Sequence, residues 1–131
     1  YSLPNLSNLG RIDMNDTHLA IGCYPGGSSF KVLELSMLSS PSYQTVPGQD
    51  CPSEVSFNDK GFFIPGDDKI IGWNSVADAL AGSSPTMSFG GKTDKTNIGT
   101  KMAAGIGWDG YHFWVGEYKF SNRLLGFAPS K

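Results

Sequence analysis

The 131-residue chain has little charge and little glutamate, and it has only two cysteines. Charged residues make up 17% of it, below the roughly 25% of ordinary soluble domains. The net charge of −2 gives no basic surface for a nucleic acid or an anionic membrane. No apolar run approaches the roughly 20 residues of a membrane-spanning helix. We therefore expect no nucleic-acid partner and no membrane insertion.

The sequence also lacks a recognised catalytic, metal or cofactor signature. No Gly-x-Ser-x-Gly elbow is present, and the two histidines and two cysteines lack zinc spacing. Residues 105–110 match the dinucleotide pattern Gly-x-Gly-x-x-Gly, but an aromatic strand follows where that motif needs a helix. Asp67 and Asp68 are weak candidates for calcium, although a solvated turn explains them better. We expect no cofactor and no enzymatic activity.

Turn-forming residues are abundant instead. The chain has 17 glycines and 8 prolines, and nine of its 12 acidic residues are aspartates, which suit turns. Apolar residues alternate with polar ones between these turns, as in half-buried strands. Residues 75–82 predict one short helix, with a capping-box start and a glycine stop. Residues 42–46 and 86–89 are candidates for additional strands. The sequence predicts a single all-β antiparallel domain over residues 1–131, excised from a longer protein.

Three segments, residues 11–35, 54–73 and 105–127, share one pattern. Each has a strand, an Asn- or Asp-containing turn, a second strand, and then a basic residue that precedes a third strand. The aligned turns are Met14-Asn15-Asp16, Phe57-Asn58-Asp59 and Trp108-Asp109-Gly110. The aligned third strands begin with Lys31-Val32-Leu33, Lys69-Ile70-Ile71 and Arg123-Leu124-Leu125.

This repeat leaves three architectures open. The copies predict a compact antiparallel barrel of pseudo-threefold, trefoil-like symmetry, or a sandwich whose hairpins look alike. Residues 109–127 are similar to a blade of the NHL and related propeller repeats, in which Asp-Gly opens one strand and Asn-Arg the next. That resemblance covers about twenty residues and implies three propeller-type blades. Three blades do not close a ring, so closure would require oligomerisation or further sequence.

Strand alternation assigns side chains to two faces of each copy. The inward face is predicted to hold three sets of aligned residues, which make Trp73 and Trp108 core residues. These sets are Ile12, Met14, Leu19, Ile21 and Leu35; Val55, Phe57, Phe62, Ile64 and Trp73; and Ile106, Trp108, Phe113, Val115 and Phe127.

Large aromatic residues on the opposite face are the predicted contact residues. Phe63 and Trp114 point outward there, and His112 and Tyr118 lie on the same face as Trp114. An exposed tryptophan with polar neighbours is suited to stacking on a sugar ring or to anchoring a protein partner. The alternative is that a loop of the domain covers Trp114.

Two features point to an oxidising, extracellular setting. Cys23 and Cys51 are candidates for a disulfide, with two buried thiols as the alternative. Asn5 and Asn15 each begin an N-glycosylation triplet. We expect a secreted protein, or one on a virion or cell surface.

These observations favour a non-catalytic recognition or attachment domain that binds a glycan or a protein receptor and forms a homo-oligomer. One alternative is a carbohydrate-active hydrolase that uses Asp109 and Glu117 as its carboxylate pair. Another is a structural oligomerisation domain, such as a protrusion of a viral coat.

Overall fold

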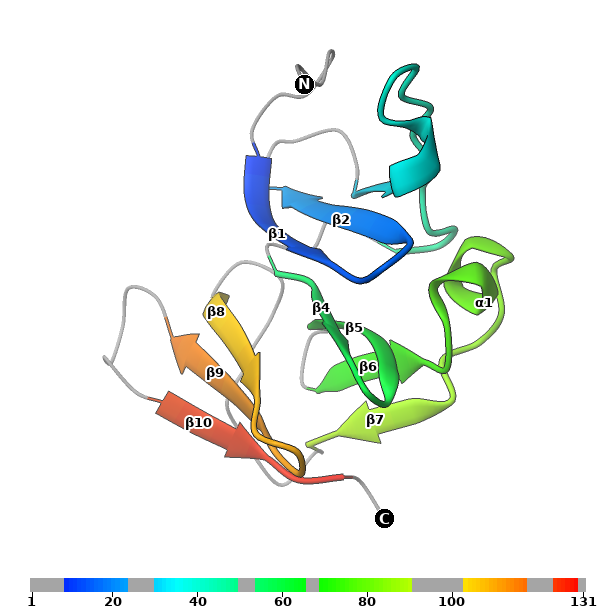
Figure 1. Ribbon diagram of the computed structural model, residues 1–131. Coiled ribbons are helices and arrows are strands. Elements are labelled where there is room, and N and C mark those ends of the chain that lie inside the picture. The colour runs from blue at the N-terminus through cyan, green and yellow to red at the C-terminus, as the bar shows by residue number, and fades with distance from the viewer. Residues whose placement is uncertain are drawn as a thin grey trace.

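The computed structural model describes residues 9–23, 30–49, 54–65, 69–90, 103–117 and 124–129. Ten strands in this part of the chain form three antiparallel sheets in which consecutive strands are neighbours (Figure 1). The predicted all-β antiparallel character is therefore confirmed. These strands close no barrel, so the prediction of a compact barrel is wrong for the described residues.

Each sheet takes up one consecutive part of the chain. The first sheet comprises β1 (Leu9–Met14), β2 (His18–Cys23) and β3 (Lys31–Glu34), followed by the 3-10 helix η1 (Leu35–Met37). The second comprises β4 (Ser56–Asn58), β5 (Gly61–Pro65), β6 (Ile70–Trp73) and β7 (Met87–Phe89), with helix α1 (Val76–Leu80) between β6 and β7. The third comprises β8 (Ala103–Trp108), β9 (Phe113–Glu117) and β10 (Leu124–Phe127).

The first hairpin of every sheet is closed by the same side-chain contact. Asn15, Asn58 and Asp109 each accept a hydrogen bond from the backbone N–H two residues further on, at 2.8 to 2.9 Å. An Asx side chain that bonds in this way replaces a backbone acceptor in a tight turn. The register of the strands is also shared. The equivalent cross-strand pairs are Met14 with Leu19, Phe57 with Phe62, and Trp108 with Phe113.

The third strand of the first sheet differs from its sequence alignment by two residues. Phe62 pairs with Trp73 and Phe113 pairs with Phe127, but Leu19 pairs with Leu33. Leu35 was predicted to share the position of Trp73 and Phe127, and it lies in η1 instead. The prediction for Leu35 is wrong because strand pairing, rather than the basic residue before the strand, sets the register.

Figure 1 shows the three sheets following one another through the molecule. Two apolar clusters join successive sheets. The first joins the Ala20–Val32 side of the first sheet to the Phe62–Ile64 side of the second. The second joins the Phe63 side of the second sheet to the Phe113–Val115 side of the third. Its buried members are Phe63, Ile70, Phe89, Phe113, Val115 and Phe127.

The second sheet is thus covered on both faces, and this overturns part of the face assignment. Phe63 was predicted to point outward, but its side chain is 0% exposed. The first sheet shows the opposite error. Ile12 and Met14 were predicted to be core residues, and they are 63% and 59% exposed. Alternation correctly separates the two faces of a strand, but which face is covered depends on the neighbouring sheet.

The short elements around the second sheet follow the sequence closely. Ser75 caps α1 by accepting the N–H of Asp78, and Gly82 ends the segment with a φ of 76°, as predicted. Residues 86–89 supply β7, the predicted fourth strand. Residues 42–46 form no full strand, and only Gln44 makes a bridge to Val32.

Candidate functional site

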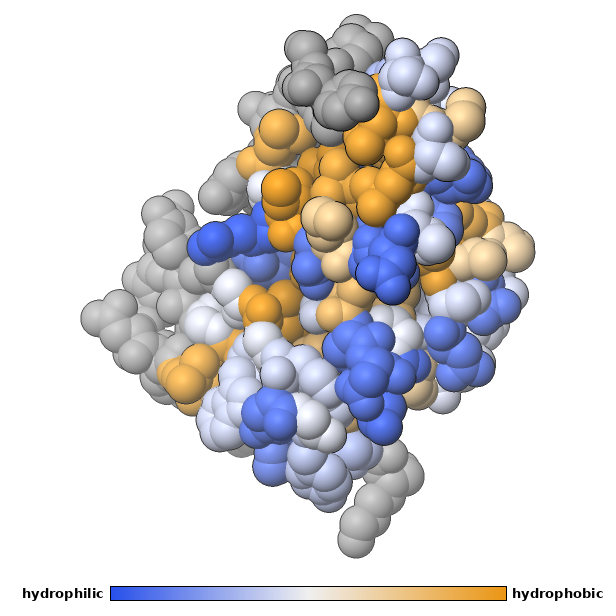
Figure 2. Space-filling model, viewed as in Figure 1, coloured by the Kyte–Doolittle hydropathy of each residue, from blue (hydrophilic) through white to orange (hydrophobic). Residues whose placement is uncertain are grey.

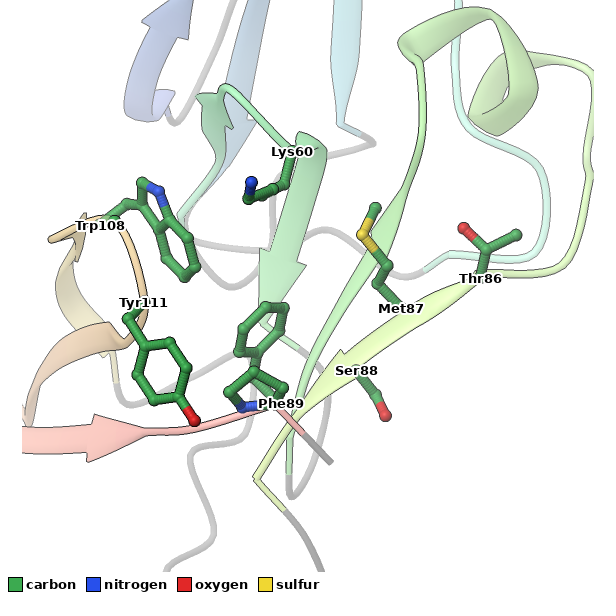
Figure 3. A pocket seen from close by; sticks show the side chains of 9 residues that line it. Lys60, Thr86, Met87, Ser88, Phe89, Trp108 and Tyr111 are labelled. Carbon is green, nitrogen blue, oxygen red and sulfur yellow. The ribbon is translucent and has the colours of Figure 1, made fainter. Parts of the chain in front are cut away.

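An open pocket of about 390 Å³ lies where the first hairpin turns of the second and third sheets meet β7 (Figure 3). Trp108 and Tyr111 lie on one side of the pocket, and Met87 and Phe89 lie on the other (Figure 3). The nine lining residues are Lys60, Thr86, Met87, Ser88, Phe89, Trp108, Gly110, Tyr111 and Pro129. Aromatic rings and polar groups therefore face one space.

The indole of Trp108 is fixed from two sides. Its ring packs edge-on against Phe89 at 5.5 Å and tilted against Phe113 at 4.7 Å, measured between ring centroids. Its Nε1–H donates to Asp59 Oδ1 at 2.9 Å. Trp108 was predicted to be a core residue; it is half-buried, packs against the second core cluster, and also lines the pocket. Its ring is held in one orientation before any ligand binds.

The Asp59 carboxylate contacts both the Trp108 indole and the Lys60 ammonium group. One carboxylate oxygen accepts the Trp108 indole N–H, and the other lies 3.1 Å from Lys60 Nζ. Hydrogen bonds from Lys60 and Trp108 hold the pKa of Asp59 below its usual value. The carboxylate thus stays ionised at neutral pH and keeps both groups at the pocket.

Tyr111 supplies the exposed ring of the pocket. It is 60% exposed, and its backbone N–H donates to Asp109 Oδ1 at 2.8 Å. The Asx turn therefore sets the position of its backbone, while its side chain contributes little to either core cluster. Its ring packs edge-on against His112 at 4.6 Å between centroids and belongs to neither core cluster, so we expect truncation of Tyr111 to leave both clusters in place.

Asp109 serves as the acceptor that organises the turn of the third sheet. Its Oδ1 accepts the N–H groups of Tyr111 and His112, and its Oδ2 accepts the Trp114 indole N–H at 2.8 Å. The His112 backbone bond, the Trp114 bond and the Tyr111 bond together hold its pKa far below the usual range. Both oxygens are thus occupied by a structural role. The side chain of Glu117, its proposed carboxylate partner, lies outside the described residues.

Two of the predicted contact residues are found together on the surface. The rings of His112 and Trp114 are 5.9 Å apart, and Trp114 is 39% exposed. Phe63 is not with them, because it is buried between the second and third sheets. Tyr118 lies outside the described residues.

The remaining candidates are placed only in part. Asn15 lies in the first hairpin turn, where its Oδ1 accepts the N–H groups of Thr17 and His18, and its glycosylation stays a prediction. The pairing of Cys23 with Cys51, glycosylation at Asn5, and calcium binding at Asp67 and Asp68 fall outside the described residues. The described part of the chain has no group of three or more His, Cys, Asp or Glu side chains suited to a metal ion. It also has no helix long and apolar enough to cross a membrane.

Sequence reasoning missed the two turn residues that face the pocket. Lys60 and Tyr111 occupy the same position of the aligned turns, two residues after Asn58 and Asp109. That position is occupied by Thr17 in the first copy. The sequence contains no signal that singles out this position, because the positions before and after it also vary between the three copies.

A second, more polar cavity of about 300 Å³ lies between β1, the two residues that precede β4, and β8. Its central pair is Arg11 and Glu54, with Arg11 Nε 3.6 Å from Glu54 Oε1. Burial raises the pKa of Glu54 to about 7, and the nearby Arg11 guanidinium only partly offsets this. Arg11 and Glu54 thus contact each other inside the fold, and burial outweighs the attraction between them.

Comparison with known proteins finds no matching family model, no matching curated protein and no matching solved structure. The described residues alone therefore define the class: they form three consecutive antiparallel sheets, so the protein is all-β.

Proposed function

We propose that this protein is a non-catalytic recognition domain that binds a glycan in the pocket lined by Trp108, Tyr111 and Lys60. The observation that carries the proposal is the convergence of two aromatic rings and an ammonium group on one open space. Sugar rings have apolar faces that stack on aromatic side chains and hydroxyl groups that need hydrogen-bond partners. A glycan is the ligand class that matches both parts of this lining.

Preorganisation of the pocket supports the same proposal. The Asp59 carboxylate holds Trp108 and Lys60, and Asp109 holds the turn that carries Tyr111. A binding site whose side chains are already ordered loses less conformational entropy when its ligand arrives. Such a domain fits an extracellular, virion-surface or cell-surface setting, where glycans are displayed.

We further propose that the three sheets are successive blades of a propeller-like array. Three features support this: consecutive strands are neighbours in each sheet, the sheets stack face to face, and β1 contacts β4 as β4 contacts β8. In such an array the hairpin turns that flank the pocket belong to adjacent blades. Loops and turns at the ends of propeller blades form a common type of binding surface, because the stacked sheets hold them in place.

Glycan-array screening followed by calorimetry tests the proposal. We expect at least one array oligosaccharide to bind, and Tyr111→Ala to weaken that binding at least about tenfold while circular dichroism stays unchanged. The matched control is Met37→Ala, which truncates another exposed apolar side chain, in η1 and away from the pocket. Absence of any bound glycan, or full binding by Tyr111→Ala, overturns the proposal.

A further inference from the structure

Among the described residues, the first and the third sheet each have one face that is not packed against another sheet. The residues on these two faces occupy the same positions of the repeat as the residues that join the sheets within the chain. Between the first and second sheets, the Ala20 face packs on the Phe62–Ile64 face. Between the second and third, the Phe63 face packs on the Phe113–Val115 face. Ala20 and Phe63 hold equivalent strand positions, and Phe62 and Phe113 do as well. In both internal contacts, therefore, the face that holds Ala20 or Phe63 packs on the face that holds Phe62 or Phe113 of the next sheet. We call this the packing rule.

Trp114 is the third member of the Ala20 and Phe63 series. The Phe63 ring lies over Gly72, its cross-strand partner, where an added Cβ would collide with it. The Trp114 ring lies over Gly126 in the same manner, 3.0 Å from the position of an added Cβ. Phe63 is completely covered by the next sheet, whereas Trp114 remains 39% exposed. Trp114 therefore has the setting of an interface residue whose covering sheet is absent.

The rest of the Trp114 face is flat and open. Gly105, Gly107 and Gly116 share this face by register, and an added Cβ at each of them would meet no atom within 4 Å. Leu124 adds an exposed apolar side chain beside them. A flat glycine surface with one large ring accepts aliphatic side chains from a facing sheet without steric conflict.

The opposite end of the array exposes aliphatic side chains. Ile12 and Met14 on β1 are more than half exposed, while their sheet neighbours Ile21 and Leu33 on the same face are buried. Figure 2 shows apolar surface over the first sheet. By the packing rule, this is the face that receives the Trp114 type of face, since Leu19 is equivalent to Phe62 and Phe113.

We infer that the Trp114 face of one copy of this chain docks head-to-tail on the Ile12–Met14 face of a second copy, and that two copies close a ring of six sheets. The occupant is a second copy because its exposed Ile12 and Met14 lie on the type of face that already receives such a contact twice within the chain. Six sheets lie within the range of closed propellers. The inference rests on the proposed blade arrangement but not on the glycan pocket, so a Tyr111→Ala protein should still associate normally.

Sedimentation velocity at protein concentrations between about 1 and 300 μM tests this inference, first on each variant alone and then on a mixture of two variants. We expect the native chain to form a dimer that grows no further, and Gly107→Glu and Ile12→Asp each to weaken association at least about tenfold. Gly107→Glu is preferred to Trp114→Ala because its side chain enters open space and leaves the fold intact. Circular dichroism of each variant checks folding.

Mixing the two variants distinguishes a head-to-tail contact from a symmetric one. The Ile12→Asp variant retains an intact Trp114 face, and the Gly107→Glu variant retains an intact Ile12 face. A contact between two unaltered faces can therefore form only between unlike chains. We expect the mixture to form a mixed dimer that neither variant forms alone. A native monomer at every concentration, open-ended growth, or a mixture that stays monomeric overturns the inference.

Discussion

The indole N–H of Trp108 in the third sheet donates to the carboxylate of Asp59 in the first hairpin turn of the second sheet, at 2.9 Å. This contact joins two sheets at the mouth of the proposed glycan pocket. The same carboxylate lies 3.1 Å from the Lys60 ammonium, so one side chain positions two lining groups.

Replacement of Asp59 by Asn should therefore weaken glycan binding severalfold. The Asn amide oxygen still accepts from Trp108, but the charge that holds Lys60 is lost. Calorimetry with the best array oligosaccharide measures this effect. Asp16→Asn is the matched control, because Asp16 follows Asn15 in the first hairpin as Asp59 follows Asn58, and it lies away from the pocket. Equal affinities of the two variants would show that Asp59 does not organise the site.

Trp73 should be the tryptophan that matters most for stability. It is buried, stacks with Phe62 at a centroid distance of 6.0 Å, and donates from Nε1 to the Ser83 carbonyl at 2.7 Å. Trp73→Ala should lower the free energy of unfolding by about 3–5 kcal/mol, measured by urea denaturation. The partly exposed Trp114 provides the comparison, and Trp114→Ala should cost the isolated chain clearly less. Similar losses for both variants would mean that the chain itself covers Trp114.

Two glycines of equal size should respond differently to the same substitution. A Cβ at Gly72 would collide with the Phe63 ring inside the second core cluster, whereas a Cβ at Gly107 would meet open space. Gly72→Ala should therefore destabilise by about 1–3 kcal/mol. Gly107→Ala should be neutral or slightly stabilising, because it lowers the entropy of the unfolded chain. Thermal melts of the two variants provide the test, and the reverse order would argue against the described packing of Phe63.

Much of this fold is predictable from local sequence, but the covering of its faces is not. The Asx turns, the cap at Ser75 and the outward direction of Trp114 depend on residues close in sequence, and the structure has them as predicted. Phe63 was misassigned because its burial is decided by the third sheet, which is distant in sequence. Ile12 was misassigned because it lies on the edge strand of its sheet, where it is exposed although its cross-strand partner Ile21 is buried. The middle sheet is covered on both faces, and alternation within one strand does not indicate how many faces of its sheet are covered.

The candidate site was only partly predictable for the same reason. Trp108 was expected to be a core residue, but it is only half-buried and packs against the second core cluster rather than within it. Its second role appears only when the turn that carries Lys60 is placed beside it by the stacking of two sheets. Tyr111 looked like an ordinary turn residue, and its exposure distinguishes it only in three dimensions.

Stability should fall as pH rises through the titration of Glu54. Burial raises its pKa to about 7 in the folded protein, above the value of about 4.3 for an unfolded chain. Its contribution is therefore fully present below about pH 4.3 and is lost as pH rises through about 7. Urea denaturation at pH 5 and pH 8 measures the difference, which Glu54→Gln should reduce. Glu34→Gln, at an exposed glutamate, is the matched control. An identical pH dependence in the native protein and Glu54→Gln would show that another group is responsible.

The three tryptophans allow the proposed function to be tested by a single nuclear magnetic resonance titration. Trp73 is in the first core cluster, Trp108 lines the pocket, and Trp114 lies on the outer face of the third sheet. Their indole N–H signals can be assigned by single Trp→Phe substitutions and followed as the best array oligosaccharide is added. A glycan in the proposed pocket should shift the Trp108 indole signal and leave those of Trp73 and Trp114 in place. A shift of the Trp114 signal with an unmoved Trp108 signal would contradict the account and place the binding site on the outer face of the third sheet.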